Sequence, residues 1–154
     1  MLTLLLLLPM IVFGQLKTTK DSFDGTIARK TDLETVCRSF KEGTAKLSIT
    51  QYIADKDTTM ILFIYLEPTS MSCFGSDSKV MLKSGDDIIS IKLEGDIDCK
   101  SAGDILMNYG QLSKEDITFL KQHNIEIMRL YFTEGYANYT INKPNYFIKT
   151  LNYF

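Results

Sequence analysis

The chain has 154 residues, a net charge of −2 at pH 7, three cysteines and one histidine. The nearly balanced charge argues against nucleic acid as a partner, and one histidine excludes a zinc site that needs two from the same chain. The sequence lacks a phosphate-binding loop, a dinucleotide-binding glycine turn and a Gly-x-Ser-x-Gly motif. We therefore expect no cofactor and a non-enzymatic protein.

Residues 1–14 form an uncharged apolar stretch that ends in Gly14, just before the polar Gln15. The apolar run from Leu4 to Phe13 is shorter than the about 20 residues of a transmembrane helix, and it fits the apolar region of a signal peptide. The usual preceding basic residue is missing, and a buried N-terminal strand or helix is the alternative. We expect a signal peptide, export to the periplasm or extracellular space, and no membrane span after its removal.

Residues 15–30 are polar, which predicts a tether or an edge segment ahead of a single domain over residues 31–154. The segment from Thr31 to Phe40 is ambiguous. Its β-branched residues permit a strand, whereas its apolar residues have helical spacing and favour a short amphipathic helix. These apolar residues are Leu33, Val36, Cys37 and Phe40.

The middle of the chain has the patterns of strands. Ala45 to Ala54 includes alternating apolar residues, and Met60 to Leu66 is an apolar run closed by Pro68, as in a central strand. Asp104 to Tyr109 is a further candidate strand.

A hairpin is predicted for Lys79–Ser84 and Asp87–Leu93, joined by a type II′ turn at Gly85-Asp86. Its register pairs Val80 with Ile91 and Leu82 with Ile89 on one apolar face.

The same register brings two of the three cysteines close together. It places Cys73 opposite Asp98, one residue from Cys99, and a bulge within Phe74–Ser78 would absorb the difference. An exported chain oxidises such a pair, so we expect a Cys73–Cys99 disulfide, with three free thiols as the alternative. Cys37 is then left over.

The clearest helix start lies at Ser113, an N-cap with Asp116 placed to complete a capping box. This predicts a helix over about residues 114–124, ended by Asn124 in a left-handed conformation. Pro144 fits the first turn of a final helix over residues 144–154.

Between these helices, Ile125 to Phe132 and the residues after Glu134-Gly135 predict a second hairpin. Its expected register places Phe132, Leu130 and Met128 opposite Ala137, Tyr139 and Ile141.

Together these elements predict an α+β domain. We expect a meandering antiparallel sheet of about six or seven strands, with both helices packed on one face.

Reactive side chains are sparse. Asp96 and Asp98 alternate, so on a strand both carboxylates would share a face, as in a carboxylate-dependent hydrolase or a calcium site. The full calcium-loop spacing is missing, and a solvated loop is the plainer interpretation. His123 falls at the predicted end of a helix, where histidine commonly interacts with free carbonyls. We expect no metal site.

Four residues of the second hairpin face away from its predicted apolar side: Tyr131, Tyr136, Asn138 and Thr140. Exposed tyrosines beside small polar side chains can stack on a sugar or contact a protein. Cross-strand packing that only stabilises the hairpin is the alternative.

Two parts of the chain carry a resemblance. The N-terminal stretch ending in Gly14-Gln15 resembles export signals of the Bacteroidetes. Residues 20–25, and residues 112–117 through 125–131, resemble small uncharacterised exported proteins of such bacteria. The resemblance implies export and a single α+β domain, and it carries no known activity.

From these features we expect an exported binding domain whose partner is an envelope protein or a glycan. A hydrolase using Asp96 and Asp98, and an inhibitor or immunity-like partner of a secreted enzyme, are the alternatives.

Overall fold

The computed structural model describes residues 16–95 and 97–154, so the predicted signal peptide lies outside the described residues. In chain order the elements are β1 (Lys17–Lys20), β2 (Ile27–Lys30), β3 (Glu34–Ser39), β4 (Gly43–Ala54), β5 (Asp57–Glu67), β6 (Ser72–Phe74), β7 (Lys79–Ser84), β8 (Asp87–Lys92), β9 (Asp98–Lys100), β10 (Leu106–Leu112), α1 (Lys114–Gln122), β11 (Ile127–Phe132), β12 (Gly135–Thr140) and α2 (Tyr146–Leu151).

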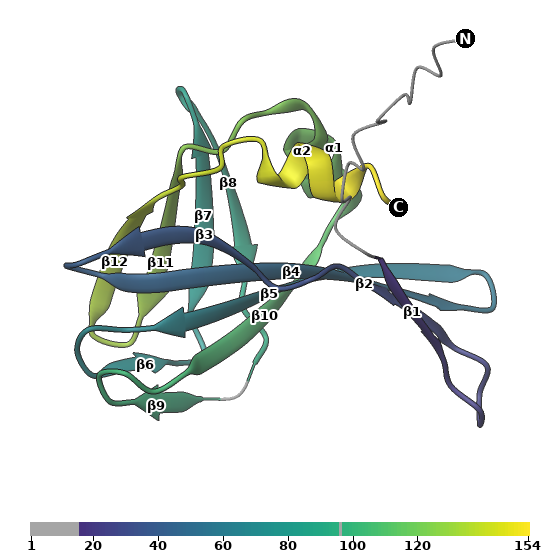
Figure 1. Ribbon diagram of the computed structural model, residues 1–154, viewed down its shortest axis with the longest axis horizontal. Helices are drawn as coiled ribbons and strands as arrows, with labels where there is room; N and C mark the ends of the chain where they lie inside the picture. Colours follow the sequence, from purple (N-terminus) through teal and green to yellow (C-terminus); the bar gives the residue numbers. More distant parts are fainter. Residues whose placement is uncertain (1–15, 96) are drawn as a thin grey trace, which may run out of the picture.

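The domain is mostly antiparallel sheet with two short helices, which confirms the α+β class (Figure 1). The expectation of one meandering sheet is wrong, because the described strands form three sheets. A large sheet contains β1, β2, β3, β4, β5 and β10; a four-stranded sheet has the order β12-β11-β7-β8; β6 and β9 form a ribbon. The chain leaves the large sheet after β5 and returns to pair with β5 only at β10.

The large sheet is built on the long hairpin of β4 and β5, whose turn contains Asp55 in a left-handed conformation with φ of 50°. Strands β2 and β3 pair one after the other with the same edge of β4. Thr31 lies between them, and its buried hydroxyl accepts a hydrogen bond from the Ile49 backbone N–H. The polar N-terminal segment thus forms two strands at the edge of the sheet, as one of its two interpretations suggested.

The short helix favoured for Thr31–Phe40 is wrong, and the segment forms strand β3 instead. A β-bulge between Thr35 and Cys37 turns both Val36 and Cys37 into the core. Two adjacent buried residues break the alternation of a regular strand, which is why the spacing resembled a helix. The ends of the supposed helical stripe lie outside the core, with Leu33 45% exposed and Phe40 fully exposed.

The first hairpin forms as predicted. Val80 pairs with Ile91 and Leu82 with Ile89, and Gly85 in the turn has a positive φ of 57°, as a type II′ turn requires. Cys73 and Cys99 form a disulfide, which confirms that prediction. They face each other directly in the β6–β9 ribbon, so the structure places Cys99 where the extended register had placed Asp98.

Both helices also differ in detail from their predicted bounds. The Ser113–Asp116 capping box is present, but α1 ends at Gln122 and the left-handed stop at Asn124 is wrong. His123 is the C-cap, with an extended backbone, and its Nδ1 lies 2.9 Å from the Phe119 carbonyl. Helix α2 begins at Tyr146, so Pro144 lies before the N-cap rather than in the first turn.

The β11–β12 hairpin forms with a register shifted by two residues from the predicted one. Leu130 pairs with Ala137 and Met128 with Tyr139, because the turn is at Thr133-Glu134 instead of Glu134-Gly135. A shift of two keeps every side chain on its predicted face.

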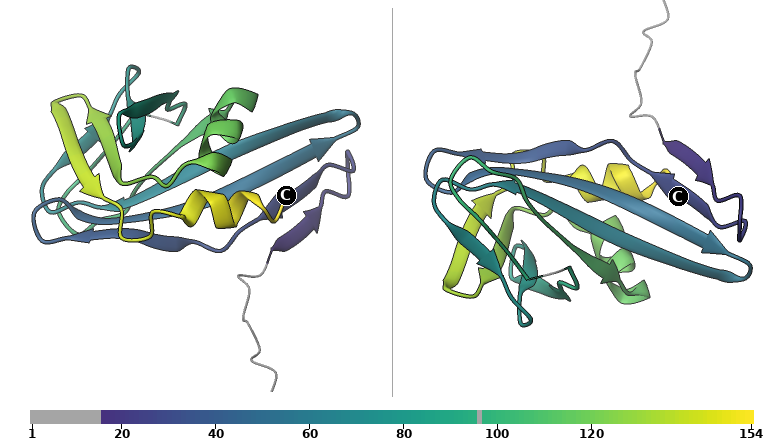
Figure 2. Two further views of the ribbon diagram at one scale, coloured as in Figure 1. Left: turned by 90° about the horizontal axis from the view of Figure 1, so that it is seen from above. Right: turned by 90° about the horizontal axis from the view of Figure 1, so that it is seen from below.

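The core lies between the large sheet and the four-stranded sheet, whose strands run across each other (Figures 1 and 2). The edges of the two sheets approach each other closely at Gly110 of β10 and Lys92 of β8. A Cβ on Gly110 would lie 2.6 Å from the Lys92 carbonyl, so a residue without a side chain is needed there. Helices α1 and α2 pack against each other and contribute Leu120, Phe147 and Leu151 to the same core. The four-stranded sheet therefore has one face in the core and one face turned outward.

Candidate functional site

The outward face of the four-stranded sheet contains all four residues singled out in the second hairpin. Alternate residues such as Leu82, Leu130 and Tyr139 are buried in the core, so the residues between them point away from it. Strand registers arrange these outward residues in three rows across β8, β7, β11 and β12. We call them the outer face: Lys92, Lys79, Tyr131 and Tyr136; Ser90, Met81, Arg129 and Asn138; Ile88, Lys83, Ile127 and Thr140.

The predicted residues lie together at the β11–β12 side of this face. Tyr136, Asn138 and Thr140 are exposed, whereas Tyr131 is half-buried. Tyr131 and Tyr136 pair across the strands, with ring centroids 5.8 Å apart. Part of the aromatic surface is thus used in cross-strand packing that stabilises the hairpin. Of the two rings, that of Tyr136, which is 58% exposed, has more surface open to a partner.

Each of these two rings also has a cation over it. Lys79 Nζ lies 4.9 Å from the Tyr131 centroid, and the Arg129 guanidinium lies 4.3 Å from that of Tyr136. Arg129 Nε in addition donates a hydrogen bond of 2.7 Å to Asn138 Oδ1. These contacts hold the arginine side chain flat against the sheet and connect the tyrosines to the middle row.

A depression of about 270 Å³ lies next to the tyrosine pair. The aliphatic side chains of Met81, Ile88 and Ile127 make its apolar part, and Ile88 is 51% exposed. Its polar lining consists of Lys83, Arg129, Asn138 and Thr140. An apolar surface with a few polar groups beside it is the usual composition of a binding depression.

The outer face is strongly positive although the chain as a whole is acidic. Four of its twelve residues are lysine or arginine and none is aspartate or glutamate. None of these cations forms an ion pair with another residue that the structure describes. Their charge is therefore left for solvent or for a partner.

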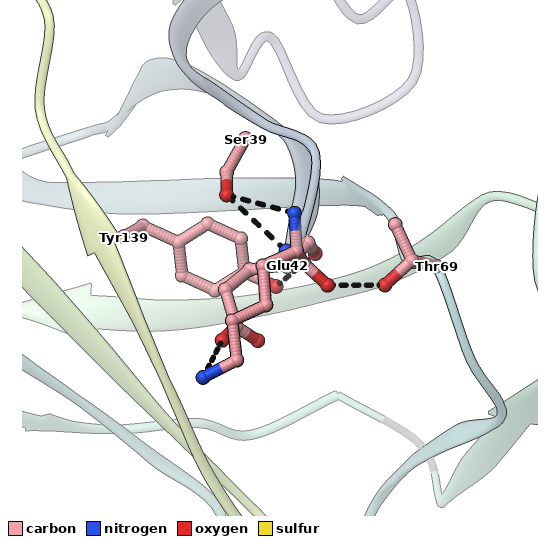
Figure 3. Close-up of polar contacts among 5 residues, drawn as sticks. Ser39, Glu42, Thr69 and Tyr139 are labelled. Carbon is pink, nitrogen blue, oxygen red and sulfur yellow. Dashed lines mark hydrogen bonds and ion pairs between the residues drawn. The ribbon is translucent and has the colours of Figure 1, made fainter.

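Tyr139 anchors the C-terminal end of β12 from the core side (Figure 3). Its hydroxyl donates to the Glu42 carbonyl at 3.2 Å, in the turn between β3 and β4. Ser39 Oγ accepts from two N–H groups of that turn, and Thr69 donates to the carbonyl of Lys41 (Figure 3). The outward residues on either side of Tyr139, Asn138 and Thr140, are thus mounted on a fixed strand.

The other candidate residues do not gather into a site. Asp96 lies outside the described residues, and Asp98 pairs with Lys100 in the ribbon at 3.2 Å. His123 stacks on Phe119 with centroids 4.2 Å apart. Cys37 is 2% exposed, and burial, followed by the nearby Glu42 charge, raises the pKa of its thiol. Among residues 16–95 and 97–154, no three metal-ligating side chains cluster.

The sequence interpretation missed most of the outer face. The correct register of the first hairpin already placed Lys79, Met81 and Lys83 opposite to the apolar side. What it could not supply is the pairing of β11 with β7, which joins the two hairpins into one surface.

Comparisons with known proteins add no assignment. The chain matches no protein-family model, and neither a curated protein nor a solved structure is significantly similar to it. In the part of the chain that the structure describes, neither helix has the length and apolar character needed to cross a membrane.

Proposed function

We propose that this protein is an exported, non-enzymatic domain that binds an envelope protein or a glycan through the outer face of its four-stranded sheet. The observation that carries the proposal is the grouping on one sheet face of exposed Tyr136, exposed Ile88 and cations that form no ion pair with a described residue, all around a depression. Exposed aliphatic and aromatic side chains that lie beside one another on a surface are typical of an interaction site rather than of a face that contacts only solvent.

Support for export comes from the sequence. Residues 1–14 have the apolar region of a signal peptide, and their resemblance to Bacteroidetes export signals agrees with a mature chain starting at Gln15. Expression of the full chain in a bacterial host, followed by fractionation, tests this. We expect the exported product to have the intact mass of a chain that starts at Gln15. A product that stays in the cytosol and retains Met1 or Leu2 contradicts export.

Site-specific photo-cross-linking tests the binding face. A photoreactive phenylalanine analogue replaces Tyr136 or Asn138 in the source organism, with Thr118 of α1 and Lys56 of the β4–β5 turn as exposed control positions. We expect one discrete cross-linked product from the two face positions and none from the controls. Equal labelling at all four positions, or none at any, contradicts the proposal.

The purified partner then allows a matched comparison. Tyr136→Ala removes an exposed ring and should change the free energy of unfolding by less than about 1 kcal/mol while it weakens binding. Tyr153→Ala removes a second exposed tyrosine outside the face and should leave binding unchanged. Tyr131 is a poorer probe because its half-buried ring also packs under Lys79.

A further inference from the structure

We infer that the partner of the outer face is an acidic protein surface that inserts an aliphatic side chain into the depression between Met81, Ile88 and Ile127. This inference rests on the proposed binding function and adds the chemistry of the partner. It follows from three properties of the face: its charge, its apolar depression and the cations over its rings.

The positive charge of the face favours a negatively charged partner. Lys79, Lys83, Lys92 and Arg129 lie on adjacent strands in paired registers, with no carboxylate in the same rows. Lys79 and Lys92 pair on adjacent strands, which lie about 4.8 Å apart, so the repulsion between these two charges is only partly screened at physiological salt. A complementary negative surface relieves this repulsion and also speeds the encounter of the two molecules.

The depression favours a protein over an acidic glycan. Met81 and Ile127 provide aliphatic surface, and burying such surface is favourable only against another apolar group. A uronate or sulfated sugar chain carries hydroxyl and acid groups that would lose water there without replacement. A protein offers Leu, Ile or Val beside Glu and Asp, which fits an apolar depression flanked by Lys83 and Arg129.

The surroundings of the two tyrosines also favour an acidic protein over a stacking ligand. Sugars and nucleobases bind tyrosine through the face of the ring. Here Lys79 lies over Tyr131 and Arg129 over Tyr136, so a stacking ligand on that side must first displace a cation. A carboxylate, by contrast, can pair with either cation while it stays on its ring.

Peptide titration followed by NMR tests the inference on the mature, oxidised chain. The probes are three short synthetic peptides, with alternating Glu and Leu, alternating Glu and Ser, and alternating Lys and Leu, together with a heparin fragment and a DNA oligonucleotide. We expect the Glu-Leu peptide to shift amide signals of β7, β8, β11 and β12 most strongly, with an affinity that falls as salt rises.

Two pairs of variants separate charge from shape. The double variant Lys83→Gln and Arg129→Gln should lower the affinity for the Glu-Leu peptide by about ten-fold. The double variant Lys56→Gln and Lys121→Gln has the same net charge but changes residues outside the face, and its affinity should be unchanged. Ile88→Ser should remove the preference for Glu-Leu over Glu-Ser, and Ile105→Ser, at another exposed isoleucine, should keep it.

Several results overturn the inference. Equal binding of Glu-Ser and Glu-Leu shows that the depression takes no apolar side chain. Tighter binding of heparin or DNA at this face identifies a different class of partner. Signal shifts that grow with protein concentration in the absence of any probe identify a second copy of the chain as the occupant. No binding of the Glu-Leu peptide also contradicts it.

The cross-linking experiment distinguishes this failure from failure of the proposed function. If Tyr136 and Asn138 capture a partner that is a glycan or a protein without acidic character, the binding function stands and only the chemistry of the partner is wrong. If they capture nothing, both fail.

Discussion

Single glycines decide how closely strands of this domain approach. Gly43 begins β4 with a φ of +90°, and a Cβ there would lie 2.0 Å from the Glu67 carbonyl. A side chain at this position would therefore meet both backbone strain and a steric clash with the end of β5.

This gives a prediction with an internal control. Gly43→Ala should lower the free energy of unfolding by more than about 2 kcal/mol, whereas Gly103→Ala should cost about 1 kcal/mol. Gly103 also has a positive φ, of 86°, but a Cβ there meets no atom within 4 Å. Urea denaturation of both variants measures the difference; equal losses would show that β4 moves away from Glu67 at no cost.

A second prediction at this scale concerns alkaline pH. Burial, and then the Glu42 charge, raise the pKa of Tyr139 above its ordinary value of 10. Above pH 10 the unfolded chain releases this proton while the folded chain keeps it, so the free energy of unfolding falls as pH rises. The contribution is fully present below pH 10.

Tyr139→Phe tests this directly. The variant loses the hydrogen bond to Glu42, about 1 kcal/mol at pH 7. Above pH 10 the free energy of unfolding of the variant should fall less steeply with pH than that of the natural protein, by up to about 1.4 kcal/mol per pH unit. Urea midpoints at several pH values provide the comparison, and parallel declines would mean that Tyr139 already titrates normally in the fold.

Among the elements, α1 owes its start to local chemistry. Ser113 Oγ accepts a hydrogen bond of 3.0 Å from the Asp116 N–H, and the Asp116 carboxylate accepts one of 2.9 Å from the Ser113 N–H. Ser113→Ala should lower the free energy of unfolding by about 1 kcal/mol. Ser90→Ala, at an exposed strand position, is the control, and thermal denaturation measures both.

The elements also show what could be predicted from the sequence. The capping box and the β7–β8 hairpin depend on residues a few positions apart, and both form as expected. The sequence does not predict strand β3, because its bulge depends on pairing with β4, which no local pattern reveals. The strand expected over Asp104–Tyr109 forms as β10 over Leu106–Leu112. Its pairing with β5 joins distant parts of the chain, so the local pattern does not predict it.

The same distinction applies to the candidate site. The sequence predicts Tyr136, Asn138 and Thr140 as neighbours because a single hairpin places them on one side. Three of the four cations belong to the β7–β8 hairpin, as do Met81 and Ile88 of the depression. Only the β7–β11 pairing brings them beside the tyrosines and Arg129. Each segment alone therefore indicates only its own half of the surface, and neither indicates that the two halves adjoin.

At the scale of the whole molecule, the Cys73–Cys99 disulfide connects two strands of a small ribbon across a sequence separation of 26 residues. Replacing both cysteines by serine should lower the free energy of unfolding by about 3.5 kcal/mol, through a less restricted unfolded chain. Urea denaturation measures this. Thiol titration of the denatured natural protein should find one thiol, Cys37, before reduction and three after it; three before reduction would contradict the bond.

The disulfide has another consequence for the molecule. It closes residues 73–99 into a covalent ring that contains the whole β7–β8 hairpin. The exposed turn at Gly85-Asp86 is the kind of loop that proteases cleave. A single cut there opens the ring without releasing a fragment, because the two pieces remain joined through sulfur. Strands β7 and β8 then stay tethered to the body of the protein, and half of the outer face survives the nick with them.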